Sequence, residues 1–149
     1  MDGLLKAYLN VPINAKIDGH YANRPKRQGV TFAYGSDISE EALILHGKTI
    51  DFRTYWIVAG TKTAFLTCEL VGSEVSDRVL ALRRVRLVKP IPFHLTLGWV
   101  LGASPVQAGN ECADFWSRMA EKGCSPPPSV QFESIVSGTI EFQNFEVKT

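Results

Sequence analysis

The stretch Pro92-Phe93-His94-Leu95-Thr96-Leu97-Gly98-Trp99 indicates a half-buried strand, because its apolar and polar residues alternate. Successive side chains of a strand point to opposite faces of the sheet, so His94 and Thr96 should emerge together. The apolar residues from Phe93 to Trp99 would share the other face and pack into a core. An imidazole and a hydroxyl about 7 Å apart on one face suit the handling of a phosphate, although a plain strand with a polar face has the same pattern.

A second copy of this pattern occurs at Gly29-Val30-Thr31-Phe32-Ala33-Tyr34-Gly35. It matches the stretch that begins at His94 at the aliphatic, threonine, large apolar, small and aromatic positions, but Gly29 stands where the histidine would be. Each copy continues through a glycine and a short loop into a helix with capping-box residues, at 37–40 and at 104–107. The sequence therefore predicts a duplicated unit of strand, loop and capped helix, with the two threonine-bearing strands side by side.

Periodicity also predicts the other elements. We expect further strands at 4–13, 50–59, 64–71, 85–88, 129–136 and 138–147, and helices at 38–45, 73–84 and 105–122. The helix at 105–122 should bury a stripe made of Ala108, Cys112, Trp116 and Met119, with Phe115 beside it. The polar segment 14–28 has no helical period and is expected to be a basic loop, which could close over an anion or only be solvated.

Composition limits the classes of function. The chain has 149 residues, of which 45% are hydrophobic and 21% charged, as in one ordinary globular domain. A formal charge of +1 argues against a strongly basic nucleic-acid coat protein but allows a local basic patch. No apolar run approaches a membrane span, and the cysteines, odd in number and without metal-site spacing, suit free thiols in a reducing compartment. We therefore expect a cytoplasmic protein without a metal, a cofactor or a membrane segment.

The sequence His94-Leu95-Thr96-Leu97 resembles the second His-x-Thr motif of the two-histidine (2H) phosphoesterases, which include LigT-like RNA cyclic phosphodiesterases and viral 2′,5′-phosphodiesterases. The resemblance extends over most of the chain in the order of the expected elements. It implies an α+β fold with antiparallel sheets in two pseudo-symmetric lobes that face a central cleft. One lobe would hold roughly residues 1–50 and the C-terminal strands, and the other residues 51–125.

The resemblance also implies roles for individual residues. His94 would act as one acid or base, while Thr96 and Thr31 would donate hydrogen bonds to the phosphate. The first motif lacks its imidazole, because Gly29 has no side chain. His20 of the basic loop could enter this gap, as could Tyr34, although the alternation of the strand favours burial of Tyr34.

Further alternatives remain open at this stage. One histidine could suffice where the leaving group needs no proton, or the site could bind a phosphate without cleaving it. The absent side chain at position 29 would leave room for a larger ligand. The candidate substrate contacts are Tyr34, Trp99, Arg27 and Lys26.

Three functions are compatible with the sequence. The first is a metal-free phosphodiesterase acting on a nucleotide or RNA phosphodiester, which would be 2′,3′-cyclic, 2′,5′-linked or part of a cyclic dinucleotide. The second is a degenerate 2H protein that binds or sequesters a nucleotide or RNA end. The third is a protein-interaction module on the same scaffold. No nucleophile elbow, Walker loop or dinucleotide fingerprint suggests a competing chemistry.

Overall fold

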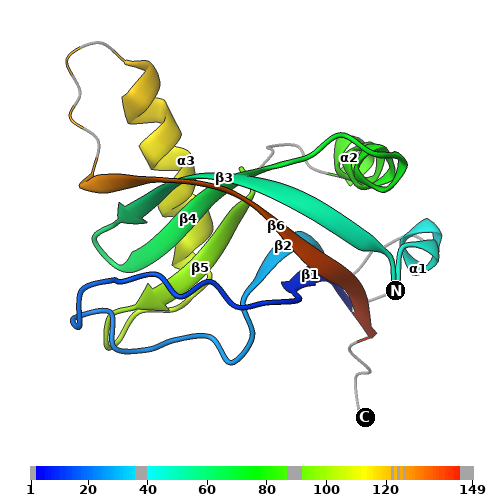
Figure 1. Cartoon of the computed structure of the whole chain (residues 1–149), viewed down its shortest axis with the longest axis horizontal. Coiled ribbons are helices and arrows are strands. Elements are labelled where there is room, and N and C mark those ends of the chain that lie inside the picture. Colours follow the sequence, from blue (N-terminus) through cyan, green and yellow to red (C-terminus); the bar gives the residue numbers. More distant parts are fainter. Residues whose placement is uncertain are drawn as a thin grey trace.

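The computed structural model describes residues 3–35, 40–86, 92–121, 123, 125 and 127–144. These residues form an α+β fold, as predicted (Figure 1). Its elements are, in chain order, β1 (Gly3–Leu9), β2 (Gly29–Gly35), α1 (Glu41–Ile44), β3 (Thr49–Ala59), β4 (Thr63–Leu70), α2 (Glu74–Arg86), β5 (His94–Trp99), α3 (Gln107–Ala120) and β6 (Ser129–Asn144).

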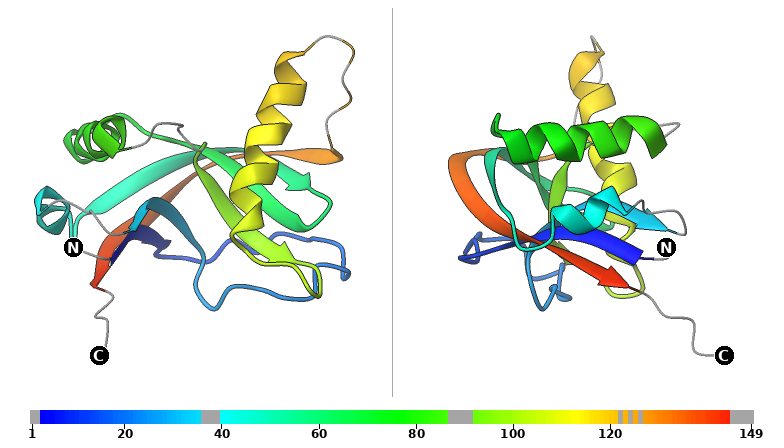
Figure 2. Two further views of the ribbon diagram at one scale, coloured as in Figure 1. Left: turned by 180° about the vertical axis from the view of Figure 1, so that it is seen from behind. Right: turned by 90° about the vertical axis from the view of Figure 1, so that its right-hand side faces the viewer.

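The six strands form one antiparallel sheet in the order β2-β1-β6-β3-β4-β5. The sheet curls strongly, so that its two edge strands, β2 and β5, approach each other and the shape is nearly that of a barrel (Figures 1 and 2). Phe32 of β2 illustrates the curl, because its ring lies 6.0 Å from that of Phe52 on β3, across two intervening strands. We call the region where β2 and β5 approach each other the seam.

We expected separate sheets facing a central cleft, and this arrangement is not observed. The pairing of β3 with β6 joins all strands into one sheet, and the inside of the curl is filled by apolar side chains. The two motif strands nevertheless form the two edges of this sheet, and the curl brings these edges next to each other. The duplicated pattern predicts such neighbouring strands.

β6 is one strand of 16 residues, whereas the sequence predicted two strands with a break near residue 137. Its first part pairs with β3 and its last part with β1, and Gly138 is opposite residues of both neighbours, Ile50 and Leu9. A Cβ at Gly138 would lie 2.9 Å from the carbonyl oxygen of Tyr8. The glycine therefore permits the close backbone approach that lets the strand change neighbours without a break.

The main core fills the inside of the curl. Its largest fully buried side chains include Leu5, Val30, Phe52, Leu66 and Leu95, which come from five different strands. The helices α1 and α2 contribute Ala42 and Val79 to the same core, and Leu45, directly after α1, joins them.

A second, smaller core lies on the opposite face of the sheet, where α3 packs on β4 and β5. It consists of Val58, Phe65, Ala108, Cys112 and Phe115. Trp116 and Met119, which we expected to be buried, are 36% and 45% exposed. The reason is that α3 extends beyond the sheet at its C-terminal end (Figure 2), so only Phe115 of its last two turns reaches the second core.

Several local predictions can be compared with the structure. The capping box before α3 forms, since Gln107 Oε1 accepts from the Ser104 backbone N–H at 3.0 Å and Ser104 Oγ accepts from the Val106 N–H at 3.3 Å. The other capping box falls on residues 37–40, of which 37–39 lie outside the described residues. The strand expected at 85–88 is wrong for its first half, because α2 continues to Arg86.

None of the helices in the described part of the chain has the length and apolar character needed to cross a membrane.

Candidate functional site

Both motif strands contain a register shift at the same position of the repeat. On β2 it falls at Phe32, since Thr31 is opposite Lys6 while Ala33 is opposite Leu5. On β5 it falls at Leu97, since Thr96 is opposite Phe65 while Gly98 is opposite Ala64. An extra residue in one strand of an antiparallel pair is a β-bulge, which redirects the side chains that follow it. The two copies therefore share a backbone irregularity, directly after the threonine, that alternation alone does not predict.

The shift changes the face on which the last aromatic residue of each copy lies. We expected Tyr34 and Trp99 to point into the core with the other apolar residues, and this prediction was wrong. Tyr34 is opposite Leu4 and 75% exposed, and Trp99 is half-buried opposite Thr63. One extra residue reverses the alternation, so each aromatic residue lies on the same face as the threonine of its copy.

His94 and Thr96 lie on the sheet face opposite the main core, together with Thr31 and Lys6. We call this face, defined by these four residues, the threonine face. His94 and Thr96 are half-buried there, whereas Thr31 is exposed. Their inward-pointing neighbours meet across the seam, because the rings of Phe32 and Phe93 pack edge to face with centroids 5.9 Å apart. The threonine-bearing strands are thus held together at the seam from the inside.

The imidazole of His94 is oriented by its backbone and by an aromatic neighbour. Its Nδ1 lies 2.9 Å from the carbonyl oxygen of Pro92, and its ring packs edge-on to Phe65 with centroids 6.5 Å apart. A carbonyl oxygen only accepts hydrogen bonds, so Nδ1 carries the proton in the neutral ring and Nε2 carries the lone pair. Nε2 is therefore the atom that could take a proton from a substrate.

The position of the missing first histidine is crowded, contrary to our expectation of spare room. A Cβ at Gly29 would lie 2.6 Å from the carbonyl oxygen of Ala7 and 2.8 Å from Cε of Lys6. It would also lie 3.2 Å from the ring of Tyr8, the residue opposite Gly29 in the ladder. Side chains of β1 therefore fill the space where an imidazole would begin.

A side chain at position 29 should destabilise the protein. We expect Gly29→Ala to lower the free energy of unfolding by about 1–3 kcal/mol, because the new methyl group meets a backbone carbonyl that cannot move aside without shifting β1. The measurement is urea unfolding followed by circular dichroism. Gly72→Ala is the control, since nothing lies within 4 Å of a Cβ there. A Gly29→Ala protein as stable as the wild type would contradict the crowding.

His20 lies far along the seam from His94. Its ring packs against Tyr21 with centroids 4.5 Å apart, and Tyr21 is held in the core by donating a hydrogen bond to the Gly60 carbonyl at 2.5 Å. The same loop pairs with Trp99 through Asn23. Trp99 is five strand positions, or about 16 Å, from His94. The structure therefore places His20 at the opposite end of β5, and does not bring the two imidazoles together.

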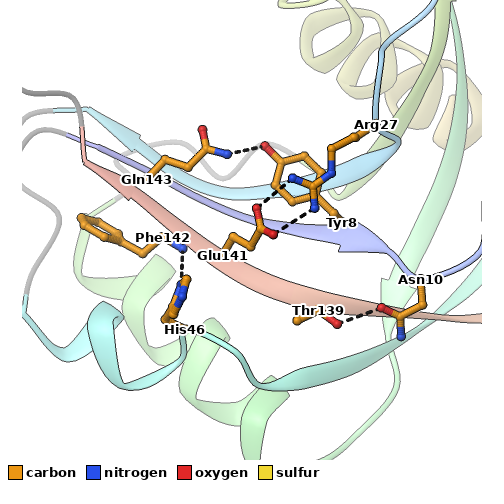
Figure 3. A network of polar contacts seen from close by, with 8 residues as sticks. All are labelled: Tyr8, Asn10, Arg27, His46, Thr139, Glu141, Phe142 and Gln143. Carbon is orange, nitrogen blue, oxygen red and sulfur yellow. Dashed lines mark hydrogen bonds and ion pairs between the residues drawn. The ribbon is translucent and has the colours of Figure 1, made fainter.

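The basic residues of the loop are placed differently from each other. Lys26 is exposed to solvent. Arg27 lies over the ring of Tyr8, 3.8 Å from its centroid, and forms a two-pronged ion pair with Glu141 at 3.0 and 2.9 Å (Figure 3). The hydrogen bond to Arg27 lowers the pKa of Glu141, so this carboxylate stays ionised and balances the guanidinium. Arg27 would have to exchange this partner to contact a phosphate.

Metal-ligand clusters, reactive cysteines and cavities are the other features that could support a reaction. Within the described ranges, no three His, Cys, Asp or Glu side chains are grouped as metal ligands. Burial raises the pKa of the Cys112 thiol to about 12 and that of Cys68 further, so neither is a reactive thiolate at neutral pH. A hollow of about 330 Å³ lies beside the start of α2, but none of the expected site residues lines it.

Sequence reasoning missed one residue of the threonine face, Lys6. Lys6 lies directly opposite both Thr31 and Glu141, on the strand between theirs. The alternation of residues 4–9 was a usable signal, because it places Lys6 on the polar face of its strand. Its neighbours across the sheet depend on the register and could not be read from that pattern.

Comparison with known proteins shows similarity in structure alone. No family description and no curated sequence matches the chain. Among 45 matching chains of solved structures is a fungal RNA kinase, with a TM-score of 0.50 and 12% identical residues. The match covers 93% of this chain and 42% of the kinase chain, so the chain spans less than half of that relative. At this identity the likeness concerns the fold.

Proposed function

We propose that the chain binds a nucleotide or RNA phosphodiester at the seam and hydrolyses it, with His94 as the acid or base and Thr31 and Thr96 as phosphate contacts. The observation that carries this proposal is the repeated bulge. It gives both edge strands the same local structure and places a threonine and an aromatic side chain from each on one face. Two hydroxyls for the phosphate and two rings for stacking a base are a coherent set of contacts for such a ligand.

A duplicated, 2H-like layout is part of the proposal. Counted inward from its edges, the sheet has the halves β2-β1-β6 and β5-β4-β3, each with its motif strand outermost and with a helix following that strand. In this proposal the two halves take the roles of the lobes that the resemblance to 2H phosphoesterases implies. The fold likeness to a fungal RNA kinase is in keeping with an RNA-related ligand.

The proposed chemistry begins at His94. Nε2 takes a proton from a water molecule as the water oxygen attacks phosphorus, and the threonine hydroxyls donate hydrogen bonds to the non-bridging oxygens as negative charge develops on them. The leaving oxygen then needs a proton, which in the 2H resemblance would come from the second imidazole. Gly29 cannot supply it, so this half of the site must differ from the family pattern.

Binding without cleavage is the second candidate function. It is favoured by the crowding at Gly29, because a positioned general acid or base contributes roughly 10²–10⁴-fold to a rate and this site lacks the usual one. A protein of this kind would hold the phosphodiester through the two threonines and a nearby cation.

Phosphorus NMR with a panel of phosphodiesters distinguishes the two candidates. The panel contains a 2′,3′-cyclic mononucleotide, a 2′,5′-linked oligoadenylate and two cyclic dinucleotides, each incubated with the wild type and with Thr31→Val/Thr96→Val. We expect new phosphomonoester resonances with at least one compound for the wild type, and much slower formation for the double variant. Shifted but intact resonances would establish binding alone. Unchanged spectra throughout the panel would contradict both candidates and favour the interaction module.

A further inference from the structure

We propose that Lys6 takes the place of the missing first imidazole, so that its ammonium group binds the phosphodiester and protonates the leaving oxygen. This inference rests on the proposed function and names the group that completes the site. It is carried by the position of the Lys6 side chain relative to Gly29 and Thr31.

The side chain of Lys6 occupies the space of the absent side chain. Its Cε lies 2.8 Å from where a Cβ of Gly29 would be, although the two residues belong to different strands. Lys6 is also directly opposite Thr31, and opposed residues of an antiparallel pair point to the same face with Cβ atoms about 5 Å apart. The Lys6 side chain therefore begins opposite Thr31 and extends along the threonine face to the position of the missing imidazole.

The surroundings of Lys6 leave its charge available. The charged and titratable groups that face it are Tyr8 on β1, Arg27 in the loop before β2, and Glu141 on β6. Glu141 is already engaged by both terminal nitrogens of Arg27 (Figure 3). Nζ of Lys6 lies 5.3 Å from the centre of the Tyr8 ring, and among the described residues no acceptor or carboxylate pairs with it. A half-buried cation without an anion is suited to receive one from a ligand.

The same surroundings make Lys6 a better proton donor than an exposed lysine. Burial, and to a lesser extent the nearby positive charge of Arg27, lowers the pKa of the Lys6 ammonium. The ammonium group therefore releases its proton more readily to an oxygen that develops negative charge. The arrival of an anionic phosphate opposes this shift, because it favours the charged form.

The complete step balances with Lys6 in this role. The water oxygen bonds to phosphorus and its proton moves to Nε2 of His94, while the bond from phosphorus to the leaving oxygen breaks and that oxygen takes a proton from Lys6 Nζ. The products are a phosphomonoester and a free hydroxyl group. The imidazolium then loses its proton to solvent, and the neutral amine regains one.

Two substitutions of Lys6 separate its charge from its proton. Lys6→Met removes both with little change in shape, and Lys6→Arg keeps the charge but cannot release a proton near neutral pH. With the compound of the panel that the wild type cleaves, we expect Lys6→Met to weaken binding at least 10-fold and to lower kcat about 100-fold. Lys6→Arg should bind within a few-fold of the wild type and remain about as slow as Lys6→Met. Lys48→Met, at an exposed lysine away from the threonine face, is the control.

The pH profile gives a readout that a structural role of Lys6 would not change. In the wild type, kcat/KM should fall at high pH as the Lys6 ammonium loses its proton, below the usual range for lysine, and the Lys6→Arg protein should lack this alkaline limb. Lys6→Met behaving as the wild type while Thr31→Val/Thr96→Val is impaired would overturn the role of Lys6 and leave the proposed function intact. Full turnover by Lys6→Arg would overturn proton donation. A wild type that neither binds nor cleaves the panel would overturn the proposed function and this inference together.

Discussion

Replacing His94 by alanine should lower kcat/KM for the cleaved phosphodiester by about 10²–10⁴-fold, because the only imidazole placed on the threonine face would be lost. Nε2 is the expected proton acceptor, since Nδ1 is committed to the carbonyl of Pro92. The loss should therefore be mainly in kcat, with a smaller change in KM, because the threonine hydroxyls remain to hold the phosphate. Steady-state kinetics with the purified protein measure both parameters.

The matched control for this prediction is His46→Ala. His46 lies after α1, where its Nδ1 accepts a hydrogen bond from the Phe142 backbone N–H at 3.0 Å (Figure 3). Its removal should leave kcat/KM within about threefold of the wild type, since it does not face the seam. His94→Ala should also unfold at a temperature close to that of the wild type. A folded His94→Ala protein with unchanged turnover would show that the imidazole does not take part.

Phe115→Ala should lower the free energy of unfolding by about 3–5 kcal/mol, the largest stability effect that we predict. Phe115 is 0% exposed and is the largest side chain that α3 contributes to the second core. This core has few members, so the cavity left by the ring cannot be filled by neighbours. Chemical unfolding monitored by circular dichroism gives the value, and a change of less than 1 kcal/mol would contradict the packing of α3 on the sheet.

The same substitution should also affect the site. Phe65 belongs to the second core together with Phe115, and its ring packs edge-on to that of His94, so loosening α3 should allow the imidazole to move. We expect turnover to fall at temperatures where most of the protein is still folded. Met119→Ala is the control, because Met119 is on the same helix but 45% exposed, and its loss should change stability and turnover little.

Much of the secondary structure could be predicted from the sequence. The hairpin of β3 and β4, the irregular loop before β2, and the two motif strands are as expected, because each is specified by local signals: alternation, turn residues and the absence of a helical period. The length of β6 and the end of α2 could not be predicted in this way. Both depend on what the segment packs against, and a serine within β6 is compatible with either a break or a continuous strand.

The candidate site was predicted in part. The alternation around His94 and Thr96 is enough to put both on one face, and the repeat is enough to relate Thr31 to Thr96. The interpretation of position 29 as spare room was wrong, because the volume beside a glycine depends on the strand opposite it, here Lys6 and Tyr8. His20 was a reasonable candidate by composition, but the pairing of its loop with Trp99 places it at the wrong end of the strand.

The sequence by itself determined the α+β class, the pair of related strands and the identity of the polar residues that they present, since these follow from short-range patterns. Only the tertiary structure decided that one sheet curls until β2 and β5 meet, and that a bulge in each turns Tyr34 and Trp99 onto the threonine face. It also decided that Lys6 fills the place of the missing side chain. The physical reason is that register, curvature and the use of space beside a glycine arise from contacts between segments far apart in the chain, and no local pattern encodes them.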